Sequence, residues 1–141
     1  MKNRKVSSNI VRQECDDKIR SLFRRFNRVR KNLNNVDESE KILSLAELDL
    51  LSKDIKELLL VKEILDNAPN REVAKIALNE IKDEIKNVDV VKPILRRANN
   101  HRKYEDDEKK EEVHELIIKA KQKTSRVLST MDLEIDKEIG Y

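Results

Sequence analysis

The densest group of side chains able to do chemistry is the basic run IRSLFRRFNRVRK at residues 19–31. Arginine suits phosphate and carboxylate groups because its planar guanidinium can donate two parallel hydrogen bonds to such an anion. Helical spacing places four of the cations opposite the apolar side chains Leu22, Phe26 and Val29. The candidate anion-binding residues are Arg20, Arg24, Arg25, Arg28, Arg30 and Lys31.

A basic amphipathic helix of this kind has three interpretations. In the first it is one helix of a bundle, and its arginines are solvated or paired with acidic side chains. In the second it is a sequence-nonspecific nucleic-acid interface made by phosphate contacts. Against this, Phe23 and Phe26 lie on the apolar face, which leaves no aromatic side chain for base stacking. In the third it meets an acidic protein partner or an anionic membrane surface.

A smaller basic cluster stands directly before the acidic run at residues 105–108. The abrupt change of sign indicates a solvated loop whose charges partly neutralise each other, and a second phosphate contact is the alternative. The cluster consists of Arg96, Arg97, His101, Arg102 and Lys103.

Catalytic and metal-binding patterns are weak in this chain. Glu111 and His114 have the Glu-x-x-His spacing of di-iron bundles, but such sites need two of these pairs, and His101 has no Glu three residues before it. Cys15 falls on an apolar stripe and is expected to be a buried, inert thiol. With a single glycine, Gly140, a phosphate-cradling loop is almost excluded. We therefore expect no enzyme activity, no metal and no cofactor.

The central element is expected to be a helix from Glu38 to Asn67, capped by Asp37 with Glu40 or by Ser44 with Glu47. Its apolar residues recur at steps of three and four, the period of one helix face. Four consecutive apolar residues at 58–61 make it apolar nearly all round, which indicates burial on several sides. The expected anchors here are Leu58, Leu59 and Leu60.

Three other helices should form a bundle with this helix. A first helix is expected over about 9–33, preceded by a disordered basic segment at 1–8. After the break at Pro69, a third helix should bury an apolar face up to Val88. A short helix at 93–98 and an exposed loop or solvated helix at 99–107 should precede a last helix at 107–138, capped near Gly140. The anchors of that last helix are Leu116, Ile117, Val127 and Leu128.

Composition supports an all-α fold. One Gly and two Pro are too few for the turns of a β-sandwich or a doubly wound sheet. We expect an elongated antiparallel bundle of four to five helices with coiled-coil-like packing, in which 9–141 form one domain. The basic N-terminus lacks an apolar core, and no apolar run could span a membrane. A soluble protein of the cytoplasm or nucleus is therefore expected.

The functional expectation follows from an excess of apolar surface. The helix at 38–67 offers more apolar perimeter than one or two neighbours can cover. We therefore expect a non-enzymatic structural or adaptor protein that binds a helical protein partner or self-associates, with no small-molecule substrate. The alternative is a nucleic-acid-binding module that uses the basic run, because residues 1–31 hold eleven Lys or Arg against three Asp or Glu, a net of +8.

Overall fold

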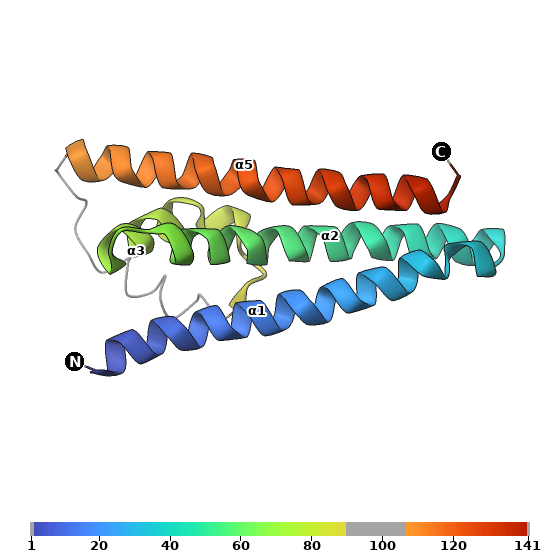
Figure 1. Ribbon diagram of the computed structural model, residues 1–141, viewed down its shortest axis with the longest axis horizontal. Helices are drawn as coiled ribbons and strands as arrows, with labels where there is room; N and C mark the ends of the chain where they lie inside the picture. The colour runs from blue at the N-terminus through green and yellow to red at the C-terminus, as the bar shows by residue number, and fades with distance from the viewer. Residues whose placement is uncertain (1, 90–106, 141) are drawn as a thin grey trace.

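The computed structural model describes residues 2–89 and 107–140, with side chains described for 10–89 and 110–140. These residues form an all-α helical bundle with no strand among them. Three long helices lie side by side along the molecule, and a shorter fourth helix packs at one end (Figure 1). In chain order the elements are α1 (Lys2–Lys31), η1 (Leu33–Asn35), α2 (Glu38–Asn67), α3 (Arg71–Glu80), η2 (Lys82–Glu84) and α5 (Asp107–Glu138).

The two ends of the bundle differ in their number of helices. α1 and α2 are antiparallel because only a short turn joins them, and α5 runs antiparallel to α2 on its other side (Figure 1). α3 packs beside the C-terminal half of α2 and against α5, so that end contains four helices. The end that holds the N-terminal half of α2 contains only α1, α2 and α5 among the described α-helices, with η1 in the turn between α1 and α2 (Figure 1).

The central helix has the bounds that the sequence predicts, Glu38–Asn67. Of the two candidate caps, Asp37 is the one used, because its side chain accepts a hydrogen bond of 2.9 Å from the amide of Glu40. The helix ends where Ala68 turns to an extended conformation before Pro69. Asn70 then caps α3 in the same manner, accepting a hydrogen bond of 2.9 Å from the amide of Val73.

Two expected helix boundaries are wrong. α1 begins at Lys2 rather than near Asn9, because the intervening residues contain no Gly or Pro to interrupt the helix. α3 ends at Glu80 rather than continuing to Val88, and a 3₁₀ turn follows it. Ile81, Ile85 and Val88 are buried nonetheless. The amides of Ile85 and Val88 donate to the carbonyls of Lys82 and Ile85, and these tight turns return the three side chains to the same core.

The last helix matches its predicted bounds. α5 spans Asp107–Glu138, and Gly140 follows it with a φ of +89°, the left-handed conformation that glycine adopts at helix ends. The amide of Gly140 donates a hydrogen bond of 3.3 Å to the carbonyl of Lys137. The short helix expected at 93–98 falls outside the described residues, as does the segment expected at 99–107 except for Asp107, which begins α5.

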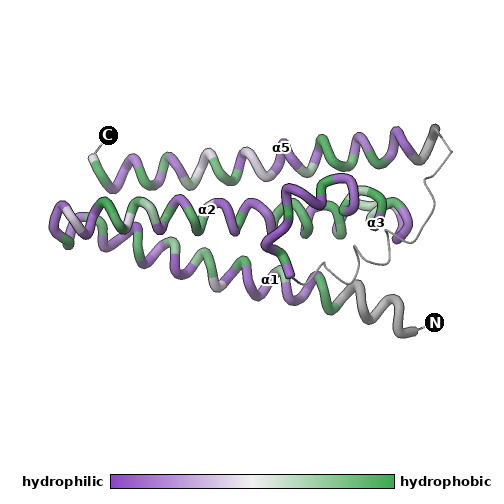
Figure 2. Tube along the Cα trace, turned by 180° about the vertical axis from the view of Figure 1, so that it is seen from behind, coloured by the Kyte–Doolittle hydropathy of each residue, from purple (hydrophilic) through white to green (hydrophobic). Residues whose placement is uncertain are grey.

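The core consists of two clusters, one at each end of the bundle. Figure 2 shows hydrophobic positions alternating with hydrophilic ones along each of the long helices. At the four-helix end, Ile64 of α2 meets Val73 and Leu78 of α3 and Val113 of α5. At the three-helix end the core is formed by Phe26, Leu33, Leu48, Leu51, Ile55 and Met131. The seven expected anchors all lie in these clusters or pack against them, with Leu58, Leu60 and Leu116 buried and Leu59, Ile117, Val127 and Leu128 partly buried.

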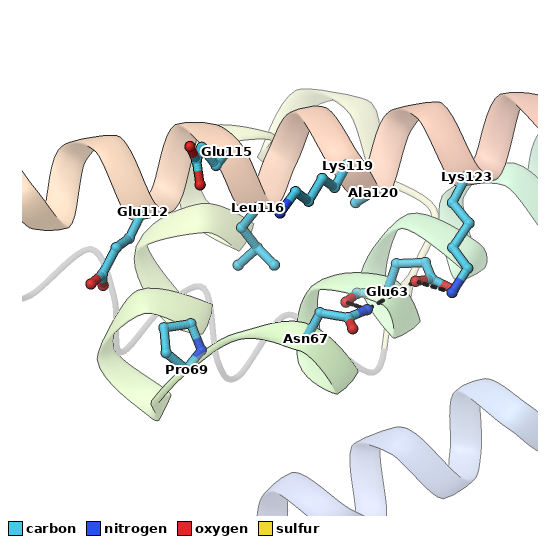
Figure 3. A pocket seen from close by; sticks show the side chains of 9 residues that line it. All are labelled: Glu63, Asn67, Pro69, Glu112, Glu115, Leu116, Lys119, Ala120 and Lys123. Atoms are coloured by element: carbon cyan, nitrogen blue, oxygen red, sulfur yellow. Dashed lines mark hydrogen bonds and ion pairs between the residues drawn. The ribbon is translucent and has the colours of Figure 1, made fainter.

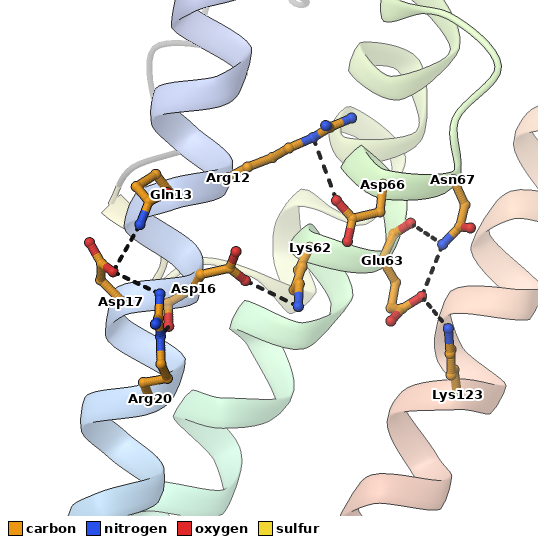
Figure 4. A network of polar contacts seen from close by, with 10 residues as sticks. All are labelled: Arg12, Gln13, Asp16, Asp17, Arg20, Lys62, Glu63, Asp66, Asn67 and Lys123. Atoms are coloured by element: carbon orange, nitrogen blue, oxygen red, sulfur yellow. Dashed lines mark hydrogen bonds and ion pairs between the residues drawn. The ribbon is translucent and has the colours of Figure 1, made fainter.

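Polar contacts align the long helices at the four-helix end. Lys62 of α2 lies 3.1 Å from Asp16 of α1, and the hydrogen bond to this carboxylate raises the pKa of the ammonium. Arg12 and Asp66 form a second contact between the same helices, at 3.5 Å. Figure 4 shows these pairs on one side of α2 and Glu63 facing α5 on the other. Partly exposed pairs of this kind contribute little stability each, but they fix the alignment of neighbouring helices.

Candidate functional site

The structure divides the six candidate anion-binding residues into two groups. Three are engaged within the molecule. Arg20 pairs with Asp17 on its own helix at 3.2 Å, whereas Arg25 reaches across to Glu47 of α2 at 2.6 Å. Arg30 is the least exposed of the three, with 15% of its side chain accessible, and contacts two carboxylates of α5. A phosphate at these positions would have to displace an existing carboxylate partner.

The other three cations have no partner within the part of the chain that the structure describes. Arg24, Arg28 and Lys31 are exposed and follow one another at steps of four and three along α1. That spacing places them on one face of the helix, opposite the buried side chain of Phe26. We call Arg24, Arg28 and Lys31 the basic stripe.

A second surface feature lies on the N-terminal half of α2. Leu43 and Leu50 expose 70% and 62% of their surface, and Ile42 exposes 67%. Leu43 and Leu50 are one heptad apart, with the small, exposed Ala46 between them. We call Leu43, Ala46 and Leu50 the α2 seam. It lies at the three-helix end, which α3 does not reach (Figure 1).

The basic stripe and the α2 seam lie on neighbouring helices. The Arg25–Glu47 ion pair joins the two helices at this level. Arg28 follows Arg25 by almost one turn, and Leu43 precedes Glu47 by about one turn. Because the helices are antiparallel, both steps run in the same direction along the bundle. Arg28 and Leu43 therefore lie at about the same height, next to the ion pair that bridges α1 and α2.

Sequence reasoning did not single out this seam. The sequence predicts a helix that is apolar nearly all round at 58–61, and this expectation does not separate Leu43 and Leu50 from the buried positions. The available signal was the heptad spacing of these two leucines, which is out of phase with the buried series Leu48, Leu51 and Ile55. Two apolar stripes on one helix predict two different neighbours. The described residues supply a neighbour for only one of these stripes.

The candidate nucleophile and the candidate metal ligands do not form a reactive site among the described residues. Cys15 is fully buried, and desolvation raises the pKa of its thiol from 9.0 to about 11. A thiol that stays protonated is a poor nucleophile. Glu111 and His114 are both exposed, and His101 lies outside the described residues. Among the residues described, no group of three or more His, Cys, Asp or Glu side chains could hold a metal ion.

An open pocket of about 530 Å³ lies between the C-terminal end of α2 and α5 (Figure 3). Its lining includes carboxylates and ammonium groups together, such as Glu112, Glu115 and Lys119. Glu63 on its wall is already engaged by Lys123 at 3.4 Å and by the Asn67 amide at 3.0 Å. Charges of both signs, partly paired with each other, favour no single class of ligand, so this pocket is a weaker candidate than the exposed surfaces.

Comparison with protein-family models, with curated proteins and with solved structures finds no match for this chain. A separate search of the described helices finds none that is long and apolar enough to cross a membrane. The functional assignment therefore depends on the surfaces of the chain itself.

Proposed function

We propose that the protein is a non-enzymatic structural or adaptor protein that binds a helical segment of another protein on the α2 seam. The observation that carries the proposal is the exposure of Leu43 and Leu50 at 70% and 62% on the uncovered side of α2. Single exposed leucines need no explanation, but two at heptad spacing form the pattern by which one helix packs against another. Ala46 between them would allow the two backbones to approach closely.

The free energy available from burying the two leucines predicts a moderate or weak interaction. Burying one leucine side chain contributes about 1.5–3 kcal/mol, so the two leucines supply about 3–6 kcal/mol before any cost. Association itself costs about 4–15 kcal/mol in lost translational and rotational freedom. The seam alone is therefore insufficient for tight binding. Neighbouring residues must add to the contact, and Ile42, exposed by 67%, is placed to do so.

Site-specific photo-cross-linking tests this proposal. A benzoylphenylalanine at position 43 of the full chain, in the cells that naturally make it, should form an adduct with one defined protein. The same probe at position 133 is the matched control, because Leu133 is also an exposed leucine, at 60%, but on α5. Leu50→Ser should remove the adduct at position 43. An adduct pattern that is equal at both positions, or unaffected by Leu50→Ser, would refute the proposal.

A second candidate function is nucleic-acid binding by the basic stripe. It is supported by the exposure of Arg24, Arg28 and Lys31 without partners in the described part of the chain. Three phosphate contacts on duplex DNA predict a slope of about −2.7 for the logarithm of affinity against that of salt concentration. Reversing the three charges should abolish both the binding and the slope. Salt-independent binding, or binding that survives the reversal, would exclude this candidate.

A further inference from the structure

Arg28 of the basic stripe lies at about the same height as Leu43 of the α2 seam on the neighbouring helix, and this placement indicates the chemistry of the partner. We infer that the segment bound on the seam is an acidic amphipathic helix, whose leucine-like face packs on Leu43 and Leu50 while its carboxylates meet Arg28 and the rest of the stripe. The inference rests on the proposed function and deepens it. It uses the same surface and names the charge that the partner must carry.

Charge complementarity is the first argument. Elsewhere on α1 the arginines have acidic partners, since Arg12 faces Asp66, Arg20 faces Asp17 and Arg25 faces Glu47. Arg30 likewise has two carboxylates of α5. The three cations of the stripe have no such partner among the described residues; Lys18, which lies nearer the other end of α1, also has none. A partner that brings carboxylates to this side would complete the pattern.

A second copy of this chain fits the surface less well. If two α2 seams packed antiparallel about a twofold axis, the α1 helices of both copies would lie on the same side of the contact. The two basic stripes would then approach each other, which places like charges together. The ion pair between Arg25 and Glu47 is satisfied within each copy and supplies no spare carboxylate to offset this. Charge therefore disfavours self-association on the seam.

The seam is also shaped for a helix rather than for a membrane or a nucleic acid. Its exposed leucines are one heptad apart on a single helix, a linear pattern that matches the knobs of another helix. A lipid surface would favour a broad apolar face with cations along its border, whereas the stripe borders the seam from α1 only. A nucleic acid would bind the cations of the stripe through its phosphates, but it would leave the exposed leucines beside them without an apolar contact.

The test uses three synthetic helical peptides of about 21 residues with the same heptad leucines. They differ only on the flanks of the leucine face, which carry Glu, Gln or Lys. Binding to the full chain is followed by fluorescence anisotropy of the labelled peptides at low and high salt. Three exposed charge pairs together should favour the Glu peptide over the Gln peptide by about tenfold at low salt. This preference should shrink at high salt, because screening weakens exposed charge pairs.

Two charge-reversed variants separate position from net charge. Arg24→Glu, Arg28→Glu and Lys31→Glu together should exchange the preference, so that the Lys peptide binds best. The control reverses Lys110, Lys119 and Arg126, three exposed cations of α5, with the same change in net charge. This control should leave the preference for the Glu peptide in place. An equal response of the two variants would show that net charge alone governs binding and would overturn the inference.

The remaining outcomes distinguish this inference from the function it rests on. If the Gln peptide binds as tightly as the Glu peptide, the acidic partner is wrong while helix docking stands. If none of the three peptides binds and position 43 gives no cross-link, both are wrong. A dimer in sedimentation equilibrium that Leu50→Ser dissociates would overturn the inference in favour of a second copy. Binding to vesicles that contain phosphatidylserine, or to duplex DNA, with loss in the stripe variant would overturn it in favour of a lipid or nucleic-acid partner.

Discussion

At the residue scale, similar side chains on α1 have very different surroundings. Arg30 is largely covered and lies 2.9 Å from Glu138 and 3.5 Å from Glu134. Nearby, the side-chain amide of Asn34 donates a hydrogen bond of 2.7 Å to the carbonyl of Glu138. These contacts attach the turn after α1 to the end of α5. Arg24, by contrast, is exposed with no partner among the described residues, so these two arginines should respond differently to mutation.

Arg30→Ala should lower the free energy of unfolding by about 1–3 kcal/mol, because it leaves a partly buried pair of carboxylates without a cation. Arg24→Ala should change it by no more than about 0.5 kcal/mol, the usual effect of an exposed position. Urea denaturation followed by circular dichroism measures both. Equal effects of the two substitutions would show that the contact between Arg30 and α5 does not stabilise the fold.

The raised pKa of the Cys15 thiol predicts that the free energy of unfolding depends on pH. Its folded pKa of about 11 lies above the ordinary value of 9.0, so the native state holds the thiol proton more tightly than the unfolded state. The corresponding stability is present below pH 9 and is lost as the pH rises through about 11. At pH 8 the native thiol should not react with Ellman's reagent on a time scale of minutes, and urea should release full reactivity. Rapid labelling of the native protein would contradict the buried position of Cys15.

At the element scale, α2 has two apolar faces with different roles. Leu48 is fully buried in the three-helix core, whereas Leu50, two residues later, is exposed by 62%. The break at Pro69 was readable from the sequence and the cap of α2 was limited to two candidates, because both effects are local. Which leucine faces a neighbour was not readable, because that depends on where α3 stops. α3 itself was placed too long, since helices and 3₁₀ turns can return apolar residues to the core at the same spacing.

Leu48→Ala should destabilise the fold by about 2–5 kcal/mol, because it removes a buried side chain and leaves a cavity. Leu50→Ala should change the free energy of unfolding by about 0.5 kcal/mol or less. Both substitutions replace leucine by alanine on the same helix. Any difference between their effects on stability therefore comes from burial rather than from the type of replacement. Chemical denaturation provides the measurement, and a large loss of stability in Leu50→Ala would assign that residue to the core.

At the scale of the whole molecule, the described helices form a bundle that changes from four helices to three along its length (Figure 1). The all-α class was predictable from the scarcity of Gly and Pro and from regular helical spacing. The candidate site was predictable only in part. The basic run was identified, but its division into paired and unpaired cations depends on carboxylates distant in sequence, such as Glu47 and Glu138. Pairing of that kind follows from tertiary packing and leaves no local signal.

We propose that the α2 seam binds a partner helix. The most direct measurement compares the anisotropy titration of the Glu-flanked peptide on the wild-type chain with that on the double variant Leu43→Ser, Leu50→Ser. We predict that the double variant loses binding at least tenfold, since it removes apolar contact worth more than about 1.4 kcal/mol. Its urea midpoint should stay close to that of the wild type, because both leucines are exposed. Unchanged peptide affinity in a stably folded double variant would contradict the claim.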